Sequence, residues 1–170
     1  MKSYPEILQV VNSYFEIGKT IDAALFLVKE YGLENPNFIG FELREAAKPE
    51  FILMTTEGEF NKPQIIRIPE NTFEFSLDLM LNLLAHEMVH VNQKTHENKI
   101  EDKNEREWQA YYEMLFHKMF PLIPELPNFQ KKFFANKAIE YYNRMGENSD
   151  LQKKYMSQKQ QVDTLLLDLK

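Results

Sequence analysis

The stretch that decides the fold runs from Ser76 to Lys94 and reads SLDLMLNLLAHEMVHVNQK. Its apolar residues recur every three to four positions, which is the spacing of one helical face. Ser76 suits the N-cap, because its hydroxyl can accept from the backbone N–H groups of a first turn. We therefore predict a long helix near residues 76–94, with apolar surroundings for the polar residues in its second half.

Those polar residues include His86, Glu87 and His90, the pattern His-Glu-x-x-His. Residues four apart lie one above the other on a helix, so both imidazoles can direct a nitrogen at one metal ion. Glu87 can reach a water on that ion without ligating it, and can take its proton as general base. A histidine on an apolar helix is usually a core or surface residue. However, this chain has only four histidines, and two of them stand at this spacing around a glutamate. A chain of this composition would show such a coincidence by chance about once in a hundred cases.

A catalytic zinc site needs a third protein ligand and an open position for water. His96 has the overall spacing of the metzincin motif, but Gln93 stands where that motif needs a glycine for its sharp turn. On a continuing helix, residue 96 lies too far along to ligate the same ion. The other candidates are Glu105 and Glu107, at the start of the next predicted helix.

Helical projection favours Glu105 over Glu107 as the third metal ligand. Glu105 shares a face with Trp108, and a carboxylate on a buried aromatic face is costly unless it is paired or holds a metal. Glu107 projects to another side with Ala110, a small residue that would let two helices approach closely. Gln109 is a candidate hydrogen-bond partner for a ligand histidine. Either glutamate has a simpler interpretation, as an acid favoured by the helix dipole at an N-terminus.

The remaining sequence predicts an α+β fold, because helices, then strands, then helices follow one another without βαβ alternation. We expect one or two helices over residues 4–31 with a break at Gly18, a small antiparallel sheet, and further helices near 103–119, 127–145 and 148–167. The predicted strands are Asn37–Glu45, Glu50–Thr56 and Gln64–Pro69. We predict a single domain over 1–170, with an upper lobe of about 1–95 and a helical lower lobe of about 96–170.

Composition excludes several classes of function. Among 170 residues there are 20 Lys and Arg, 26 Asp and Glu, and no cysteine. The acidic balance argues against nucleic acid or a membrane surface as partner, and the lack of cysteine excludes disulfides, thiolate zinc sites and cysteine nucleophiles. No apolar run is long enough for a membrane span, and Pro5 and Glu6 interrupt any signal peptide, so we expect a cytoplasmic protein.

These motifs resemble those of the zincin metallopeptidases, specifically the gluzincin type, in which a glutamate on the next helix completes His-Glu-x-x-His. Asn104–Gln109, NEREWQ, is similar to the second motif of thermolysin-like and related small bacterial and phage families. Glu105 occupies its ligand position, whereas Trp108 and Gln109 depart from it. The resemblance covers about residues 50–120 and implies a zincin-like fold, whose edge strand binds substrate in extended form.

The resemblance also implies an enzyme: a Zn²⁺-dependent metallopeptidase that acts on a peptide or protein substrate. Glu87 would accept a proton from the zinc-bound water and later pass it to the leaving amine. Zincins usually supply a further donor to the developing oxyanion. The eligible residues are Tyr111, Tyr112, His117, Tyr141, Tyr142 and Arg144. The alternatives are a non-catalytic zincin-fold binding or accessory protein, and a metalloenzyme that cleaves another kind of bond.

Overall fold

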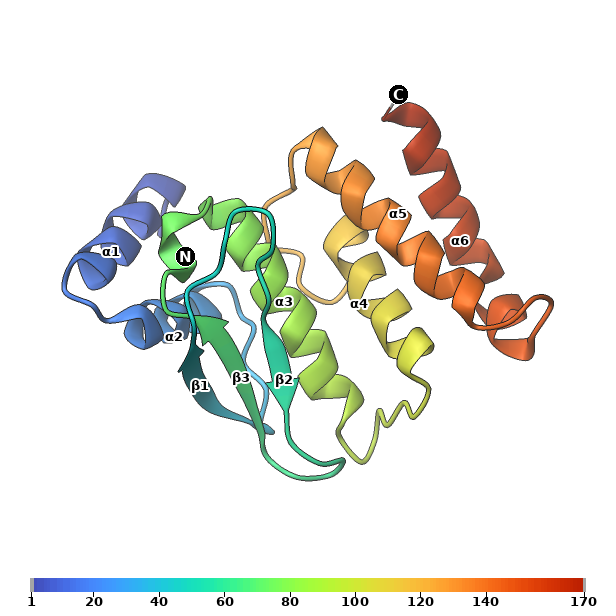
Figure 1. Cartoon of the computed structure of the whole chain (residues 1–170), viewed down its shortest axis with the longest axis horizontal. Coiled ribbons are helices and arrows are strands. Elements are labelled where there is room, and N and C mark those ends of the chain that lie inside the picture. Colours follow the sequence, from blue (N-terminus) through green and yellow to red (C-terminus); the bar gives the residue numbers. More distant parts are fainter. Residues whose placement is uncertain (1, 170) are drawn as a thin grey trace.

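The computed structural model describes residues 2–169, and over these it has six α-helices, a three-stranded sheet and one short 3₁₀ helix. In chain order they are α1 (Tyr4–Glu16), α2 (Thr20–Glu30), β1 (Phe38–Arg44), β2 (Thr55–Glu57), β3 (Gln64–Pro69), η1 (Thr72–Glu74), α3 (Leu77–Gln93), α4 (Lys103–Phe116), α5 (Asn128–Arg144) and α6 (Asp150–Asp168). The predicted α+β class and the predicted helices are confirmed. The sheet with α1 and α2 forms one half, here called the sheet half; α4, α5 and α6 form the helical half, and α3 runs between them (Figure 1).

The prediction of an antiparallel sheet was wrong, because the sheet is mixed. The strand order is β1-β3-β2, with β1 parallel and β2 antiparallel to β3. Ile66 and Ile68 of β3 are fully buried, so this strand takes the centre, whereas the half-exposed β2 lies at an edge. The strands alternate in direction along the chain, so a third strand in the central position must run parallel to the first. Of the predicted strand 50–56, only Thr55 and Thr56 belong to β2.

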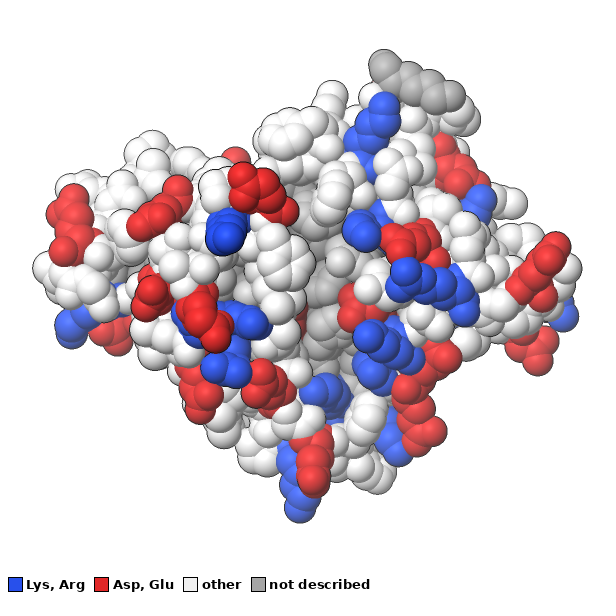
Figure 2. Space-filling view, viewed as in Figure 1, with Lys and Arg blue, Asp and Glu red and all other residues white. Residues whose placement is uncertain are grey.

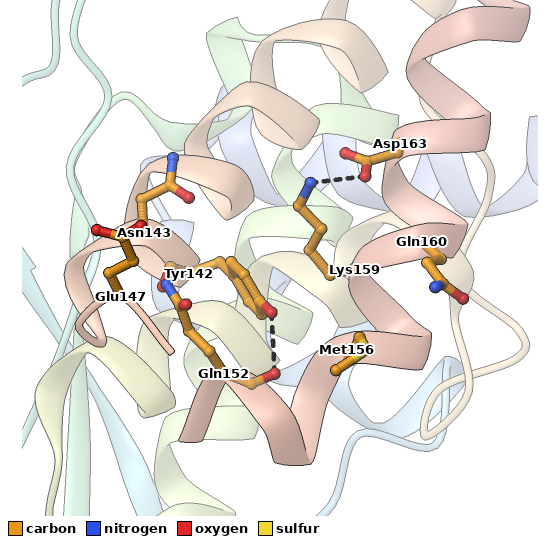
Figure 3. A pocket seen from close by; sticks show the side chains of 8 residues that line it. All are labelled: Tyr142, Asn143, Glu147, Gln152, Met156, Lys159, Gln160 and Asp163. Atoms are coloured by element: carbon orange, nitrogen blue, oxygen red, sulfur yellow. Dashed lines mark hydrogen bonds and ion pairs between the residues drawn. The ribbon is translucent and has the colours of Figure 1, made fainter. Parts of the chain in front are cut away.

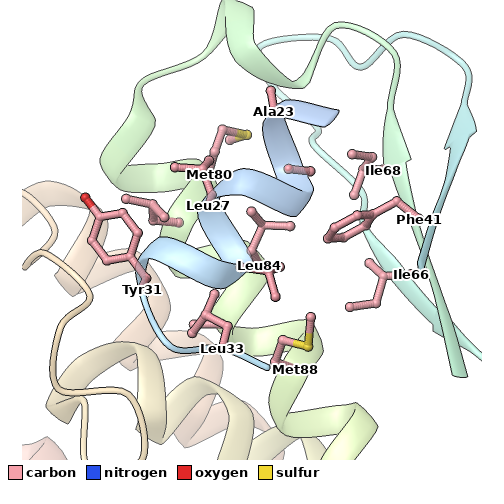
Figure 4. Close-up of a cluster of buried hydrophobic side chains, with 14 of the residues drawn as sticks. Ala23, Leu27, Tyr31, Leu33, Phe41, Ile66, Ile68, Met80, Leu84 and Met88 are labelled. Carbon is pink, nitrogen blue, oxygen red and sulfur yellow. The ribbon is translucent and has the colours of Figure 1, made fainter. Parts of the chain in front are cut away.

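Buried apolar side chains form two clusters. The first joins α1, α2, the sheet and α3, with Leu27 and Leu84 among its fully buried members (Figure 4). The second fills the helical half around Trp108, which is also fully buried. Burying each such large apolar side chain stabilises the fold by about 1.5–3 kcal/mol. Leu79 and Leu83 of α3 pack against both clusters, so α3 lies at the junction of the two halves.

The ends of α3 and α4 are set by local signals. Ser76 is the N-cap of α3 as predicted, although its hydroxyl makes no capping hydrogen bond. Asp102 caps α4, because its carboxylate accepts from the backbone N–H of Glu105 at 2.8 Å. This cap fixes where α4 begins. Within residues 2–169, no helix combines the length and the apolar character needed to cross a bilayer.

Candidate metal centre

Three donor side chains meet where α3 passes α4. The Nε2 atoms of His86 and His90 lie 3.1 Å apart. Oε2 of Glu107 lies 3.6 Å from Nε2 of His86, and Oε1 lies 3.7 Å from Nε2 of His90. Among the described residues, these three side chains form the one group of histidine and acidic side chains able to hold a metal ion.

The donor atoms lie close enough together to share one ion. Zinc bonds of about 2.0–2.2 Å place neighbouring ligand atoms roughly 3.3–3.6 Å apart. The two imidazole nitrogens are 3.1 Å apart, and they lie 3.6 and 3.7 Å from different oxygens of Glu107, which is close to that spacing. His86 and His90 are only 6% and 9% exposed, so little solvent competes for their nitrogens. The buried group therefore fits a divalent cation with three protein ligands.

Glu107, not Glu105, supplies the carboxylate of this group, which corrects the preferred sequence prediction. The carboxylate of Glu105 points into the helical half, where its Oε1 accepts from the Tyr155 hydroxyl at 2.6 Å and from Lys154 Nζ at 2.7 Å. A buried carboxylate needs a charge or hydrogen-bond partner. Glu105 has found both on α6, and it lies outside the group that could hold an ion.

The rotation of α4 about its axis explains why Glu107, and not Glu105, faces the histidines. Its aromatic face, which carries Glu105 and Trp108, packs into the helical half, where the Trp108 ring meets Tyr142 and Tyr155. The face turned towards α3 carries Glu107 and, one turn later, Tyr111, whose ring centroid lies 4.6 Å from that of His86. Both contacts with His86 come from positions four apart, as one helical face requires.

The other two sequence candidates lie outside the cluster. His96 is exposed in the loop that follows α3, and it is not part of the group of three. Gln109 does not touch a histidine, but it accepts a hydrogen bond from Gln93 at 3.1 Å, and Gln93 in turn meets Nδ1 of His90 at 2.8 Å. The predicted contact of Gln109 with a ligand histidine is therefore indirect.

Glu87 lies beside the cluster and is 6% exposed. The hydroxyl of Thr56 on β2 donates to Glu87 Oε2 at 2.8 Å and also lies 3.0 Å from the backbone oxygen of Glu87. This contact links the edge strand to α3 and restricts the rotation of the Glu87 carboxylate. Glu87 is thus held next to the three donors without being one of them.

A cleft of about 520 Å³ opens at the cluster, between the edge of the sheet half and the helical half. Figure 2 shows this hollow in the middle of the molecule. One wall is formed by residues 52–56 and the other by α4 together with Tyr141 of α5. Of the six residues eligible as oxyanion donors, Tyr111 and Tyr141 line the cleft, and their rings stack with centroids 5.7 Å apart.

Burial dominates the electrostatics of the cleft. It lowers the pKa of His90, an effect that neighbouring His86 strengthens. Burial by itself would raise the pKa of Glu107, but the hydrogen bond to His86 and the charge of His90 outweigh it, and the pKa is lowered. Burial also raises the pKa of Tyr111, so its hydroxyl keeps its proton. Near neutral pH these shifts favour neutral His90 and ionised Glu107, the protonation states of metal ligands.

A larger hollow of about 650 Å³ lies away from the cluster, between α5 and α6 (Figure 3). Its side chains are already paired with one another in part: Lys159 with Asp163 at 2.6 Å, and the Tyr142 hydroxyl with the backbone oxygen of Gln152 at 2.9 Å. It contains no histidine, and none of the predicted ligands or the predicted catalytic glutamate. The smaller cleft is therefore the one that contains the candidate metal ligands and the candidate general base.

Three residues around the centre were not identified as partners from the sequence: Thr56, Gln93 and Tyr155. Gln93 gave a usable signal, since it lies three positions after His90 on a buried stretch, and an amide there must find partners. Thr56 and Tyr155 come from distant parts of the chain, and no local pattern marks them.

No protein-family model, curated protein or solved structure matches this chain. What the site can do is therefore inferred from its own donor atoms and their geometry.

Proposed function

We propose that this chain is a zinc-dependent metallopeptidase of zincin-like architecture. In this proposal His86, His90 and Glu107 hold the ion, and Glu87 is the catalytic general base. The observation that carries it is the convergence of two imidazole nitrogens and one carboxylate within 4.8 Å of one another. Catalytic zinc sites of the two-histidine, one-glutamate type have this donor set with an open position for water.

The role of Glu87 follows from its position. It is buried beside the cluster, and its Oε2 is engaged by Thr56. Bound zinc would lower the pKa of a coordinated water and polarise a substrate carbonyl. Glu87 would accept the proton of that water at Oε1, the oxygen not engaged by Thr56, and deliver it to the leaving amine. Of the candidate donors to a developing oxyanion named from the sequence, the Tyr111 and Tyr141 hydroxyls are the two whose residues line the cleft.

The cleft suits an extended peptide. Residues 52–56 form one wall and end in β2, which is an edge strand of the sheet. An edge strand offers unpaired backbone groups to which a peptide can add as a further strand. A peptide lying along this wall would pass Thr56, and therefore Glu87, within the same cleft.

Zinc is preferred over iron for a reason of chemistry. Two histidines and one carboxylate also serve non-haem Fe(II) enzymes, which activate oxygen. A buried glutamate held beside the donors supports hydrolysis, because hydrolysis needs a base next to the attacking water. Elemental analysis of the purified protein distinguishes the two metals directly.

The test combines metal content with one pair of variants, Glu87→Gln and Glu97→Gln. Glu97 is exposed in the loop after α3, so its variant controls for the loss of one acidic charge. We expect one zinc per chain in the wild type and in both variants. We expect hydrolysis of a mixed peptide library by the wild type and by Glu97→Gln, and its loss by more than about 100-fold in Glu87→Gln.

The outcomes separate the alternatives. Full activity in a folded Glu87→Gln variant would contradict the proposed base. Stoichiometric zinc without turnover on any peptide would favour the non-catalytic binding or accessory protein. Iron in place of zinc would point to a different reaction, on a bond other than a peptide bond.

A further inference from the structure

A continuous chain of hydrogen bonds leads from His90 to the C-terminal helix. Nδ1 of His90 lies 2.8 Å from Oε1 of Gln93, and Nε2 of Gln93 donates to Oε1 of Gln109 at 3.1 Å. Nε2 of Gln109 donates to the Tyr155 hydroxyl at 2.5 Å, and that hydroxyl donates to Oε1 of Glu105 at 2.6 Å. These five residues, from His90 to Glu105, are called the relay below. They come from α3, α4 and α6.

The direction of the relay is fixed at both ends. Nε2 of Gln93 also donates to the backbone oxygen of Arg106 at 3.0 Å, and a backbone oxygen can only accept. Gln93 must therefore present its own oxygen to His90. At the other end, Glu105 Oε1 accepts from Lys154 Nζ as well, as an ionised carboxylate does. Every link then has one donor and one acceptor, and Nδ1 of His90 must carry the proton.

His86 differs from His90 in this respect. Its Nδ1 is buried and has no hydrogen-bond partner among the described residues. The Nε2 atoms of the two rings are 3.1 Å apart. With the proton of His90 on Nδ1, its Nε2 carries a lone pair that faces the cluster. The relay thus determines which nitrogen of His90 is offered to an ion, whereas nothing comparable holds His86.

We infer that Gln93, Gln109, Tyr155 and Glu105 are positioning residues that hold His90 as a metal ligand, and that α6 thereby takes part in forming the metal centre. This inference rests on the proposed metal site. A ligand histidine commonly donates its second nitrogen to a carboxylate, which fixes the tautomer and raises the basicity of the ring. Here the carboxylate of Glu105 acts from a distance, through a phenol and two amides.

The relay also accounts for the burial of its members. Gln93 is 2% exposed, Tyr155 5% and Glu105 8%, and burying such polar groups is costly unless they are hydrogen-bonded. A purely structural tie between α4 and α6 would need only Tyr155 and Glu105. The extension through Gln109 and Gln93 reaches His90, which a structural tie does not require.

The experiment compares two Tyr→Phe variants on the same pair of helices. Tyr155→Phe removes the hydroxyl in the relay. Tyr112→Phe is the matched control, because the Tyr112 hydroxyl also donates from α4 to a glutamine of α6, Gln161 Oε1 at 2.5 Å, outside the relay. Zn²⁺ affinity is measured by competition with a chelating indicator. We expect Tyr155→Phe to weaken binding about 3- to 10-fold and Tyr112→Phe to leave it within about twofold of the wild type.

A second variant, Gln93→Met, breaks the relay at its first link while keeping the side-chain length. The expected loss of Zn²⁺ affinity is about 10- to 100-fold, as for a direct partner of a ligand histidine. Equal affinities in the wild type, Tyr155→Phe and Tyr112→Phe would overturn the inference, provided that circular dichroism shows all three folded.

A readout without metal separates this inference from the proposed function. In the metal-free wild type, ¹⁵N chemical shifts of the imidazole should show His90 protonated on Nδ1, and in Gln93→Met the two tautomers should mix. If the wild type binds no Zn²⁺ but shows this tautomer shift, the proposed metal site fails and the positioning of His90 stands. If His90 is protonated on Nε2 in the metal-free wild type, or does not respond to Gln93→Met, the positioning role is refuted whatever the metal affinity.

Discussion

Replacing Glu107 by glutamine is expected to weaken Zn²⁺ binding by more than about 100-fold, whereas the same change at Glu105 should cost less than about tenfold. The two positions make a matched pair, since both are glutamates in the first two turns of α4. The change removes one negative charge and keeps the size of the side chain in both cases. Only the place of the carboxylate relative to the histidines differs.

The magnitudes follow from where the two carboxylates lie. The oxygens of Glu107 lie 3.6 and 3.7 Å from the two Nε2 atoms, so this carboxylate would contact the ion directly. Residues that act through a ligand typically cost 10- to 100-fold, so a charged ligand should cost at least the upper value, or more than about 2.7 kcal/mol. Glu105 is four hydrogen bonds from His90, and its partner Lys154 has a side chain that is 58% exposed and well screened.

The assay is a competition titration with a chelating indicator at neutral pH, repeated with Co²⁺, whose visible absorption reports the coordination geometry. Circular dichroism establishes that both variants are folded. Two results would refute the reasoning: wild-type affinity in Glu107→Gln, or an equal loss in the two variants. The second result would mean that the place of the carboxylate relative to the histidines does not decide how tightly the ion binds.

Two further predictions concern Thr56, beside the cluster, and His117, at the C-terminal end of α4. Thr56→Val removes the hydroxyl that holds Glu87 Oε2; if the chain hydrolyses peptides, kcat should fall roughly tenfold at unchanged Zn²⁺ affinity, and an unchanged kcat would exclude this role. Burial lowers the pKa of His117 in the folded protein. Below about pH 6.5 the unfolded chain therefore binds more protons at this residue than the folded protein does. The free energy of unfolding should decrease as the pH falls from there through the folded-state pKa. His117→Asn, which tolerates the positive φ of 45° at this position, should flatten the fall in urea midpoint between pH 6.5 and 5; parallel curves for variant and wild type would contradict the assignment.

The helices could be predicted from the sequence because their signals are local. The apolar spacing of residues 76–94 and the break at Gly18, which has a φ of +70°, both lie within a few residues of the element that they define. The order of the strands could not be predicted in this way. It depends on β3 outcompeting β2 for the buried central position, which is a property of the assembled sheet.

The candidate site could likewise be predicted only in the part that depends on local sequence. His86 and His90 are brought together by one helical turn, so the sequence places them next to each other without further information. The third donor depends on how α4 is rotated when it docks against α3, and that rotation is set by the packing of Trp108 in the helical half. The spacing of Glu107 and Tyr111, four positions apart, was the available sign of the face that meets α3.

The two glutamates of α4 also show why burial alone does not identify a metal ligand. The carboxylate of Glu105 is buried but already has hydrogen-bond donors, because the Tyr155 hydroxyl and the Lys154 ammonium both donate to its Oε1. Glu107 faces the Nε2 atoms of His86 and His90, and with the relay in place the Nε2 of His90 carries a lone pair. A lone pair turned towards a carboxylate in a buried site is unfavourable unless a positive charge lies between them. Of the two acidic groups, it is therefore the one that faces two imidazole nitrogens, and not the one already paired with Tyr155 and Lys154, that favours a cation.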